Sequence, residues 1–82
     1  MKRFEMLRLC HGVYENGRMN YDKWSVDGQS TTTLNWVTLV TYETRESCVD
    51  WIKLYKEEIE DITALDEHGY GTRELGNKPI TL

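Results

Sequence analysis

The dipeptide Asn16-Gly17 constrains the fold more than any other local feature, because it separates two stretches rich in β-branched and aromatic residues. Both residues accept positive φ angles, as a two-residue type I′ hairpin turn requires. The sequence therefore predicts an antiparallel hairpin whose residues face one another at equal distances from the turn. Glu15 is then opposite Arg18, a charge-complementary pair beside the turn.

The expected pairing divides the side chains of this hairpin between two faces, because side chains alternate along a strand. The candidate core face carries Leu7, Leu9, Val13, Trp24 and Val26. The second face is mixed, and its apolar members are Met6, Tyr14, Met19 and Tyr21. Arg8 and Lys23 lie beside them on this second face.

A third strand is predicted at residues 34–42, which are dense in β-branched and aromatic side chains. Its adjacent apolar pairs are typical of a strand that is buried on one face and partly covered on the other. Asp27-Gly28 marks the turn before this strand, and the polar run at residues 29–33 indicates a long, mobile loop.

A helix that faces the core is expected next. Thr44 suits its N-cap, and Glu46 in the first turn faces the positive end of the helix dipole. Apolar residues recur at alternating spacings of four and three, and this stripe consists of Cys48, Ile52, Tyr55, Ile59 and Ile62. At about 100° per residue, Trp51 flanks the stripe and Leu54 points away from it.

These elements predict one α+β domain spanning residues 1–82, with the element order β-β-β-α. We expect a small antiparallel sheet of three strands packed against one α-helix. A short fourth strand near residues 78–82 is the alternative. The glycines and the proline of residues 63–82 indicate a loop-rich C-terminal segment.

The charge of the chain is unevenly distributed. Fourteen acidic and ten basic side chains give a formal net charge of −4, which argues against general binding to DNA or to anionic membranes. Residues 1–42 carry five basic and four acidic side chains, whereas residues 43–82 carry five basic and ten acidic ones. The negative charge therefore belongs to the helix and the segment after it.

Four of these acids lie on the helix face opposite the apolar stripe, within an arc of roughly 60°: Glu46, Asp50, Glu57 and Asp61. The predicted acidic contact surface consists of Glu46, Asp50, Glu57, Glu58, Glu60 and Asp61. Like-charge pairs four residues apart cost a few tenths of a kcal/mol each. We interpret the row as a contact surface for a larger basic, nucleic-acid-handling protein. A merely solvated outer face is the alternative.

The apolar members of the second sheet face form a second candidate contact surface, which consists of Met6, Tyr14, Met19 and Tyr21. Such a patch marks a protein contact or a homodimer interface, unless the C-terminal segment covers it. Aromatic residues on a sheet face are also typical of proteins that bind single-stranded RNA or DNA. A small regulator that contacts nucleic acid directly, or a homo-oligomeric structural protein, is therefore an alternative function.

No residue pattern indicates catalysis or a cofactor. The expected pairing places His11 opposite Asp22, which we interpret as a structural pair because no nucleophile is held nearby. Cys10, His11, Cys48 and His68 lack the spacing of the usual zinc sites. We therefore expect no catalytic residues, no metal and no cofactor, with both cysteines as free thiols.

The sequence thus predicts a small, cytoplasmic, non-catalytic binding module, without a membrane span or direct contact to nucleic acid, that is a monomer or a homodimer. We expect it to dock on, and to inhibit or redirect, a basic partner. Small acidic single domains without active sites are common among virus-encoded inhibitors of host machinery, including anti-defence proteins. This association rests on size and charge.

Overall fold

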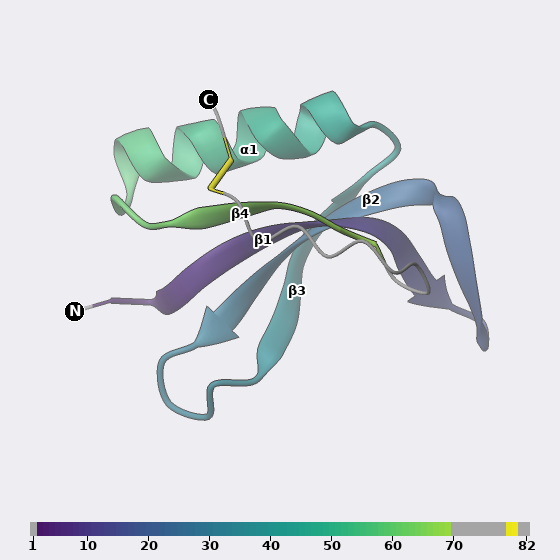
Figure 1. Ribbon diagram of the computed structural model, residues 1–82, viewed down its shortest axis with the longest axis horizontal. Coiled ribbons are helices and arrows are strands. Elements are labelled where there is room, and N and C mark those ends of the chain that lie inside the picture. Colours follow the sequence, from purple (N-terminus) through teal and green to yellow (C-terminus); the bar gives the residue numbers. More distant parts are fainter. Residues whose placement is uncertain (1, 70–78, 81–82) are drawn as a thin grey trace.

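The computed structural model describes residues 2–69 and 79–80 of the chain. Its elements are β1 (Phe4–Glu15), β2 (Arg18–Ser30), β3 (Trp36–Tyr42), α1 (Arg45–Glu58) and β4 (Ala64–Gly69). The strands form one sheet in the order β3-β2-β1-β4, and α1 lies along one face of it (Figure 1). A small α+β domain with one helix is therefore confirmed.

β4 makes the sheet mixed, because it runs parallel to β1. The expectation of a purely antiparallel sheet is thus wrong at this strand, although β1, β2, β3 and α1 follow in the predicted order. β4 also lies inside the segment 63–82 that the sequence predicts to be loop-rich. Near the expected last strand, Pro79 forms an isolated antiparallel bridge with Leu65, and residues 78, 81 and 82 lie outside the described residues.

The hairpin register is as predicted only next to the turn. Glu15 pairs with Arg18 and Val13 pairs with Asn20, but farther along β1 His11 pairs with Trp24 instead of Asp22. Two additional residues of β2 are accommodated between these pairs. Figure 1 shows the resulting sharp bend in β2. The predicted pairing of His11 with Asp22 is therefore wrong.

The two additional residues of β2 form a β-bulge, and Asn20 and Gly12 account for it. The side-chain oxygen of Asn20 accepts a hydrogen bond of 2.9 Å from the backbone N–H of Asp22, an Asx turn that folds β2 locally. Opposite it, Gly12 has a φ of 104°, a conformation that side chains disfavour. A Cβ at Gly12 would lie 2.9 Å from the Met19 methyl carbon and 3.0 Å from the ring of Tyr21. The bulge therefore depends on glycine at this position.

The shift by two residues leaves the side chains on their predicted faces. Leu9 is now opposite Val26, and both are fully buried under α1, as is Leu7. Helix residues and the segments near β4 complete the core, which consists of Leu7, Leu9, Val26, Cys48, Ile52, Tyr55, Ile62, Ala64 and Ile80. Trp24 packs against this cluster from the side.

The predicted turn at Asp27-Gly28 does not exist, because both residues lie inside β2. Gly28 is needed within the strand, since Phe4 and Leu39 pack across it and a Cβ there would lie 2.8 Å from the ring of Phe4. The connection to β3 is therefore short and hydrogen-bonded. The Ser30 hydroxyl accepts from the backbone N–H groups of Thr32 and Thr33, each at 3.2 Å.

The start of the helix is as predicted and its end is not. Thr44 is the N-cap, and its hydroxyl accepts a hydrogen bond of 3.2 Å from the backbone of Ser47. α1 ends at Glu58 with Ile59 as the C-cap, so Ile59 leaves the apolar stripe and is 55% exposed. Acids at residues 57–61 oppose the negative end of the helix dipole, which disfavours further turns. Asp61 therefore lies beyond the helix.

Within the part of the chain that the structure describes, no helix has the length and apolar character that crossing a membrane requires.

Candidate functional site

The outward face of α1 combines exposed acids with one large apolar side chain. Leu54 points away from the sheet and is 55% exposed. Asp50 precedes it by one helical turn, and Glu57 and Glu58 follow it by one turn, so all three carboxylates surround it. We call Asp50, Leu54, Glu57 and Glu58 the outer helix surface. Ile59, also 55% exposed, continues it past the end of α1.

The carboxylates of the outer helix surface are not neutralised within the fold. Among residues 2–69 and 79–80, none of Asp50, Glu57 and Glu58 takes part in an ion pair. Glu57 and Glu58 also lie in the last turn of α1, where a negative charge opposes the helix dipole and costs about 0.3–1 kcal/mol at low ionic strength. The surface therefore presents a net negative charge to a partner, although the exposed Lys53 lies one helical turn from both Asp50 and Glu57.

The other predicted acids have different surroundings. Glu46 occupies the first turn of α1, where its charge stabilises the helix. Glu60 is half-buried after the helix, and its carboxylate accepts a hydrogen bond of 3.3 Å from the backbone N–H of Arg3. Asp61 is exposed beyond the helix end. Of the six acids, Glu60 is thus engaged in holding the start of the chain against the helix end.

Glu60 also influences the buried Tyr55. Burial raises the pKa of the Tyr55 hydroxyl, and the nearby negative charge of Glu60 raises it further. The hydroxyl oxygen is buried and has no hydrogen-bond partner among the described residues. Tyr55 stacks on Trp51, with ring centroids 5.2 Å apart. The ring of Tyr55 also lies 6.4 Å from that of Phe4 on β1, so aromatic packing joins this end of α1 to the sheet.

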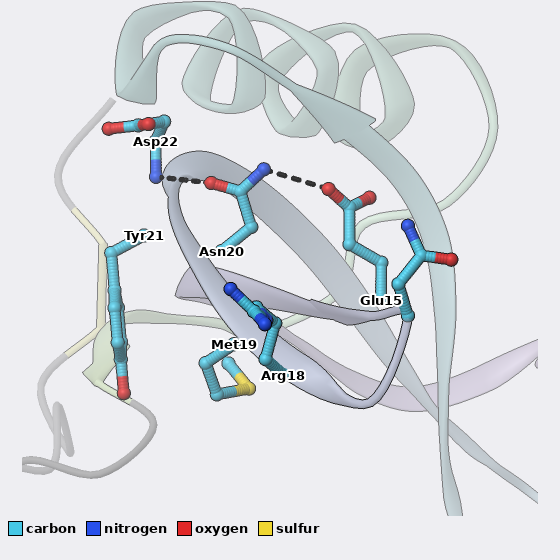
Figure 2. Close-up of a pocket in the computed structure, with 7 residues that line it drawn as sticks. Glu15, Arg18, Met19, Asn20, Tyr21 and Asp22 are labelled. Carbon is cyan, nitrogen blue, oxygen red and sulfur yellow. Dashed lines mark hydrogen bonds between the residues drawn. The ribbon is translucent and has the colours of Figure 1, made fainter.

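The second candidate surface is only partly assembled. Met19 and Tyr21, both drawn in Figure 2, lie over Gly12. Tyr14 is the cross-strand partner of Met19. Tyr14 is 70% exposed and Tyr21 is 45% exposed. Met6 lies six positions before Gly12 on β1, roughly 20 Å away along an extended strand. The structure thus brings together three of the four residues at the hairpin end of the sheet, where the ring of Tyr21 also meets that of His11 at 5.8 Å.

Two shallow hollows adjoin these three side chains. One, of about 330 Å³, is lined by Gly12, Val13, Tyr14, Met19, Ser25 and Thr38. The other, of about 600 Å³, lies at the hairpin end and shares Met19. Figure 2 shows the hollow at the hairpin end, where the Asn20 amide lies between Glu15 and Asp22.

The polar groups around the tyrosines are paired with one another. Asn20 donates to Glu15 at 2.7 Å, and the ammonium group of Lys23 lies 3.3 Å from the same carboxylate. The hydrogen bond from Asn20, and then that from Lys23, lower the pKa of Glu15. The positive charge of Lys23 is thus balanced by an acid, which weakens its attraction for a phosphate backbone, and Arg18 is the cation that lines the hollow with Met19 and Tyr21.

Of the residues weighed for chemistry, Cys10 is the cross-strand partner of His68 on β4, whereas Cys48 lies on α1. The described residues contain no group of three or more side chains that could hold a metal ion. Nε2 of His11 lies 2.9 Å from the carbonyl oxygen of Tyr21, so this nitrogen carries a hydrogen. The imidazole ring stacks on Trp24 with a centroid distance of 4.1 Å. Cys10 and Cys48 are fully buried thiols, and burial raises the pKa of Cys48 to about 11. A protonated, buried thiol is a poor nucleophile and a poor metal ligand.

Sequence reasoning missed a buried polar cluster on the sheet face away from α1. The Asp27 carboxylate, 2% exposed, accepts from Arg8 and from the thiol of Cys10, both at 3.4 Å. The guanidinium of Arg8 also lies over the ring of Trp36, 4.1 Å from its centroid. The bulge places Arg8 opposite Asp27 instead of Ser25. A glycine inside a strand often marks a bulge, so Gly12 was the feature of the sequence that could have indicated this change of hairpin register.

Comparison of the chain with protein-family models, with curated proteins and with solved structures finds no match. Its function is therefore argued from its surfaces.

Proposed function

We propose that the chain is a non-catalytic, cytoplasmic protein-binding domain that docks on a larger basic, nucleic-acid-handling protein through the outer helix surface and inhibits or redirects it. The observation that supports this proposal is Leu54, exposed at the centre of carboxylates that have no ion-pair partner in the described part of the chain. By size and charge, the setting we propose is that of a virus-encoded inhibitor.

The composition of this surface supports a protein partner. Protein interfaces combine an apolar centre with a polar rim, and a few central side chains contribute most of the binding energy. Leu54 has the central position and Asp50, Glu57 and Glu58 form the rim. The last turn of α1 carries Lys56, which favours the helix dipole, but also Glu57 and Glu58, which oppose it and so do not serve the stability of the helix.

The sign of the charge indicates a basic partner. Complementary charges accelerate association and orient the two proteins, and both effects weaken as salt screens them. A protein groove that binds a nucleic-acid backbone presents such basic charge. The carboxylates on consecutive turns of α1 would then occupy the positions of phosphates in that groove.

Matched charge variants test the proposal. Glu57→Gln/Glu58→Gln removes two negative charges from the outer helix surface. Asp22→Asn/Glu43→Gln removes two exposed negative charges elsewhere. Each immobilised chain is used to capture proteins from a host lysate at low and at high salt, and the proteins are quantified by mass spectrometry.

We expect a basic protein to be recovered with the wild type and with the Asp22/Glu43 variant at low salt. Its recovery should fall about tenfold or more with the Glu57/Glu58 variant, since close interfacial charge pairs are worth roughly 1.5 kcal/mol or more. A captured protein that binds both variants equally would contradict the proposal, as would capture that is insensitive to salt.

Leu54→Ser tests the apolar part of the surface. Because the Leu54 side chain is exposed, this change should leave the fold intact and weaken capture at every salt concentration. Unchanged capture by Leu54→Ser would show that charge alone accounts for binding and would remove Leu54 from the surface.

A further inference from the structure

β3 forms an edge of the sheet that no other described strand covers. The strand order places β3 at one edge and β4 at the other. The outer side of β4 is bridged by Pro79, and the backbone N–H of Ile80 donates to Ala64 at 2.7 Å. In residues 2–69 and 79–80, no strand pairs with the outer side of β3. Such an edge presents backbone N–H and C=O groups that can pair with another strand.

The β3 edge lacks two of the features that usually prevent such pairing and carries a third. Natural edge strands are blocked by charged side chains, by proline or by a β-bulge that twists the edge away, and of these β3 has only a bulge. Residues 28–42 contain neither a charged side chain nor proline, although 29% of the chain is charged. Two copies of a chain with a net charge of −4 can therefore approach with least repulsion along this edge.

A bulge gives β3 a nearly symmetric pattern of side chains. Val40 pairs with Val26 and Thr38 pairs with Asp27, so Leu39 is the additional residue. Leu39 packs against the core. In a regular strand, residues three positions apart lie on opposite faces. The bulge instead places Thr38 and Thr41 on one face and Val37 and Tyr42 on the other.

The register with β2 identifies these faces. Thr38 and Thr41 are opposite Asp27 and Ser25, whose side chains lie on the sheet face away from α1. Val37 and Tyr42 are opposite Gly28 and Trp24, which lie on the face toward α1. All four residues of β3 are exposed, Val37 by 46% and Tyr42 by 37%.

We propose that the protein forms a homodimer in which β3 pairs antiparallel with β3 of a second copy, about a two-fold axis at the bulge. This arrangement places Thr38 opposite Thr41 and Val37 opposite Tyr42 of the second copy, each pair on one face. Thr–Thr pairs and pairs of aromatic with β-branched residues stabilise adjacent strands. A two-fold contact uses the same patch on both copies, as these pairs require.

The connection before β3 supports this contact. Leu34 is 57% exposed and has a φ of 63°, which is unusual for a large side chain. Its conformation is held by hydrogen bonds, from its N–H to Ser30 at 2.9 Å and from the Gln29 amide to its carbonyl at 3.1 Å. In the proposed dimer, Leu34 lies next to the residues that follow Tyr42 of the second copy. The fold thus holds an apolar side chain at the boundary of the contact.

Sedimentation equilibrium tests the dimer. We expect the average mass of the wild type to rise from 9.7 kDa toward twice that value as the concentration increases to about 1 mM. Thr38→Lys/Thr41→Lys, which brings lysines opposite each other, should remain monomeric. Asp22→Asn/Thr63→Lys changes the net charge by the same amount at exposed positions elsewhere and should dimerise like the wild type.

Two results would overturn the proposal: a wild type that stays at 9.7 kDa throughout, or equal loss of the dimer in both double variants. The contact is separate from the outer helix surface, so either proposal can fail alone. Circular dichroism confirms that each variant is folded.

Cysteine crosslinking tests the register. An oxidised mixture of Thr38→Cys and Thr41→Cys chains should form mixed disulfide dimers severalfold faster than either chain alone, because these positions face each other only between unlike chains. The native Cys10 and Cys48 are fully buried and do not compete. Equal rates for the mixture and for the single variants would contradict the proposed pairing.

Discussion

Replacing Gly12 by alanine should strongly destabilise the protein, because the bulge of β2 is built around this residue. Gly12 has a φ of 104°, so alanine there costs roughly 1–3 kcal/mol in backbone strain. The added methyl group would also lie 2.9 Å from the Met19 methyl carbon and 3.0 Å from the Tyr21 ring. Moving these side chains adds about 1 kcal/mol or more. We expect a total loss of about 3 kcal/mol.

Gly17 provides the matched control. Its φ of 80° also favours glycine, but a Cβ there meets no atom within 4 Å. Gly17→Ala should therefore cost only the backbone part, about 1–2 kcal/mol. The difference between the two variants measures the packing of Met19 and Tyr21 over Gly12.

Urea unfolding followed by tryptophan fluorescence measures both variants. A domain of this size has a free energy of unfolding of roughly 4–12 kcal/mol, so a loss of about 3 kcal/mol gives a large shift of the midpoint. If Gly12→Ala lowers the free energy of unfolding no more than Gly17→Ala does, the close packing over Gly12 is refuted. If neither variant changes it, the positive φ angles are refuted as well.

Three further predictions concern stability. Leu34→Asn should raise the free energy of unfolding by roughly 0.5–1 kcal/mol, because asparagine tolerates the left-handed conformation at φ 63°; a urea midpoint that falls instead would contradict the strain. Asp27→Asn removes the buried carboxylate beside Arg8 and should cost about 3 kcal/mol, whereas adding Arg8→Met should recover part of the loss in the same assay. Burial raises the pKa of Cys48 from 9.0 to about 11, so the folded thiol keeps its proton where the unfolded thiol loses it. The contribution of Cys48 to the free energy of unfolding is therefore complete below pH 9 and is lost between pH 9 and about 11, by at most roughly 1.4 kcal/mol per pH unit. In Cys48→Ala the free energy of unfolding should decline less steeply over this range. An identical decline in the variant and the wild type would exclude Cys48 as its source.

The features that short-range physics determines could be predicted from the sequence. The type I′ turn at Asn16-Gly17 and the cap at Thr44 depend on one or two residues each. The buried positions Cys48 and Ile52 follow from helical periodicity. The same periodicity indicated that Leu54 points outward, which is the central feature of the outer helix surface.

The features that depend on contacts between distant residues could not be predicted. The register of the hairpin changes because Gly12 and Asn20 act together across two strands, and neither residue alone specifies the shift. β4 is polar in sequence and forms because β1 is available as a parallel neighbour. Glu60 meets the backbone of Arg3 across 57 positions in the chain. Folding therefore removes Glu60 from the set of freely presented acids.

Photo-crosslinking tests the central claim, that the outer helix surface is the contact surface, most directly. A photoreactive amino acid is placed at Leu54 in one chain and at Tyr14 in another, both positions being exposed. After irradiation in a host lysate, the crosslinked proteins are identified by mass spectrometry. The proposal predicts that Leu54 crosslinks to a basic protein and that this product is lost with Glu57→Gln/Glu58→Gln. Crosslinks to protein or nucleic acid from Tyr14, with none from Leu54, would contradict it.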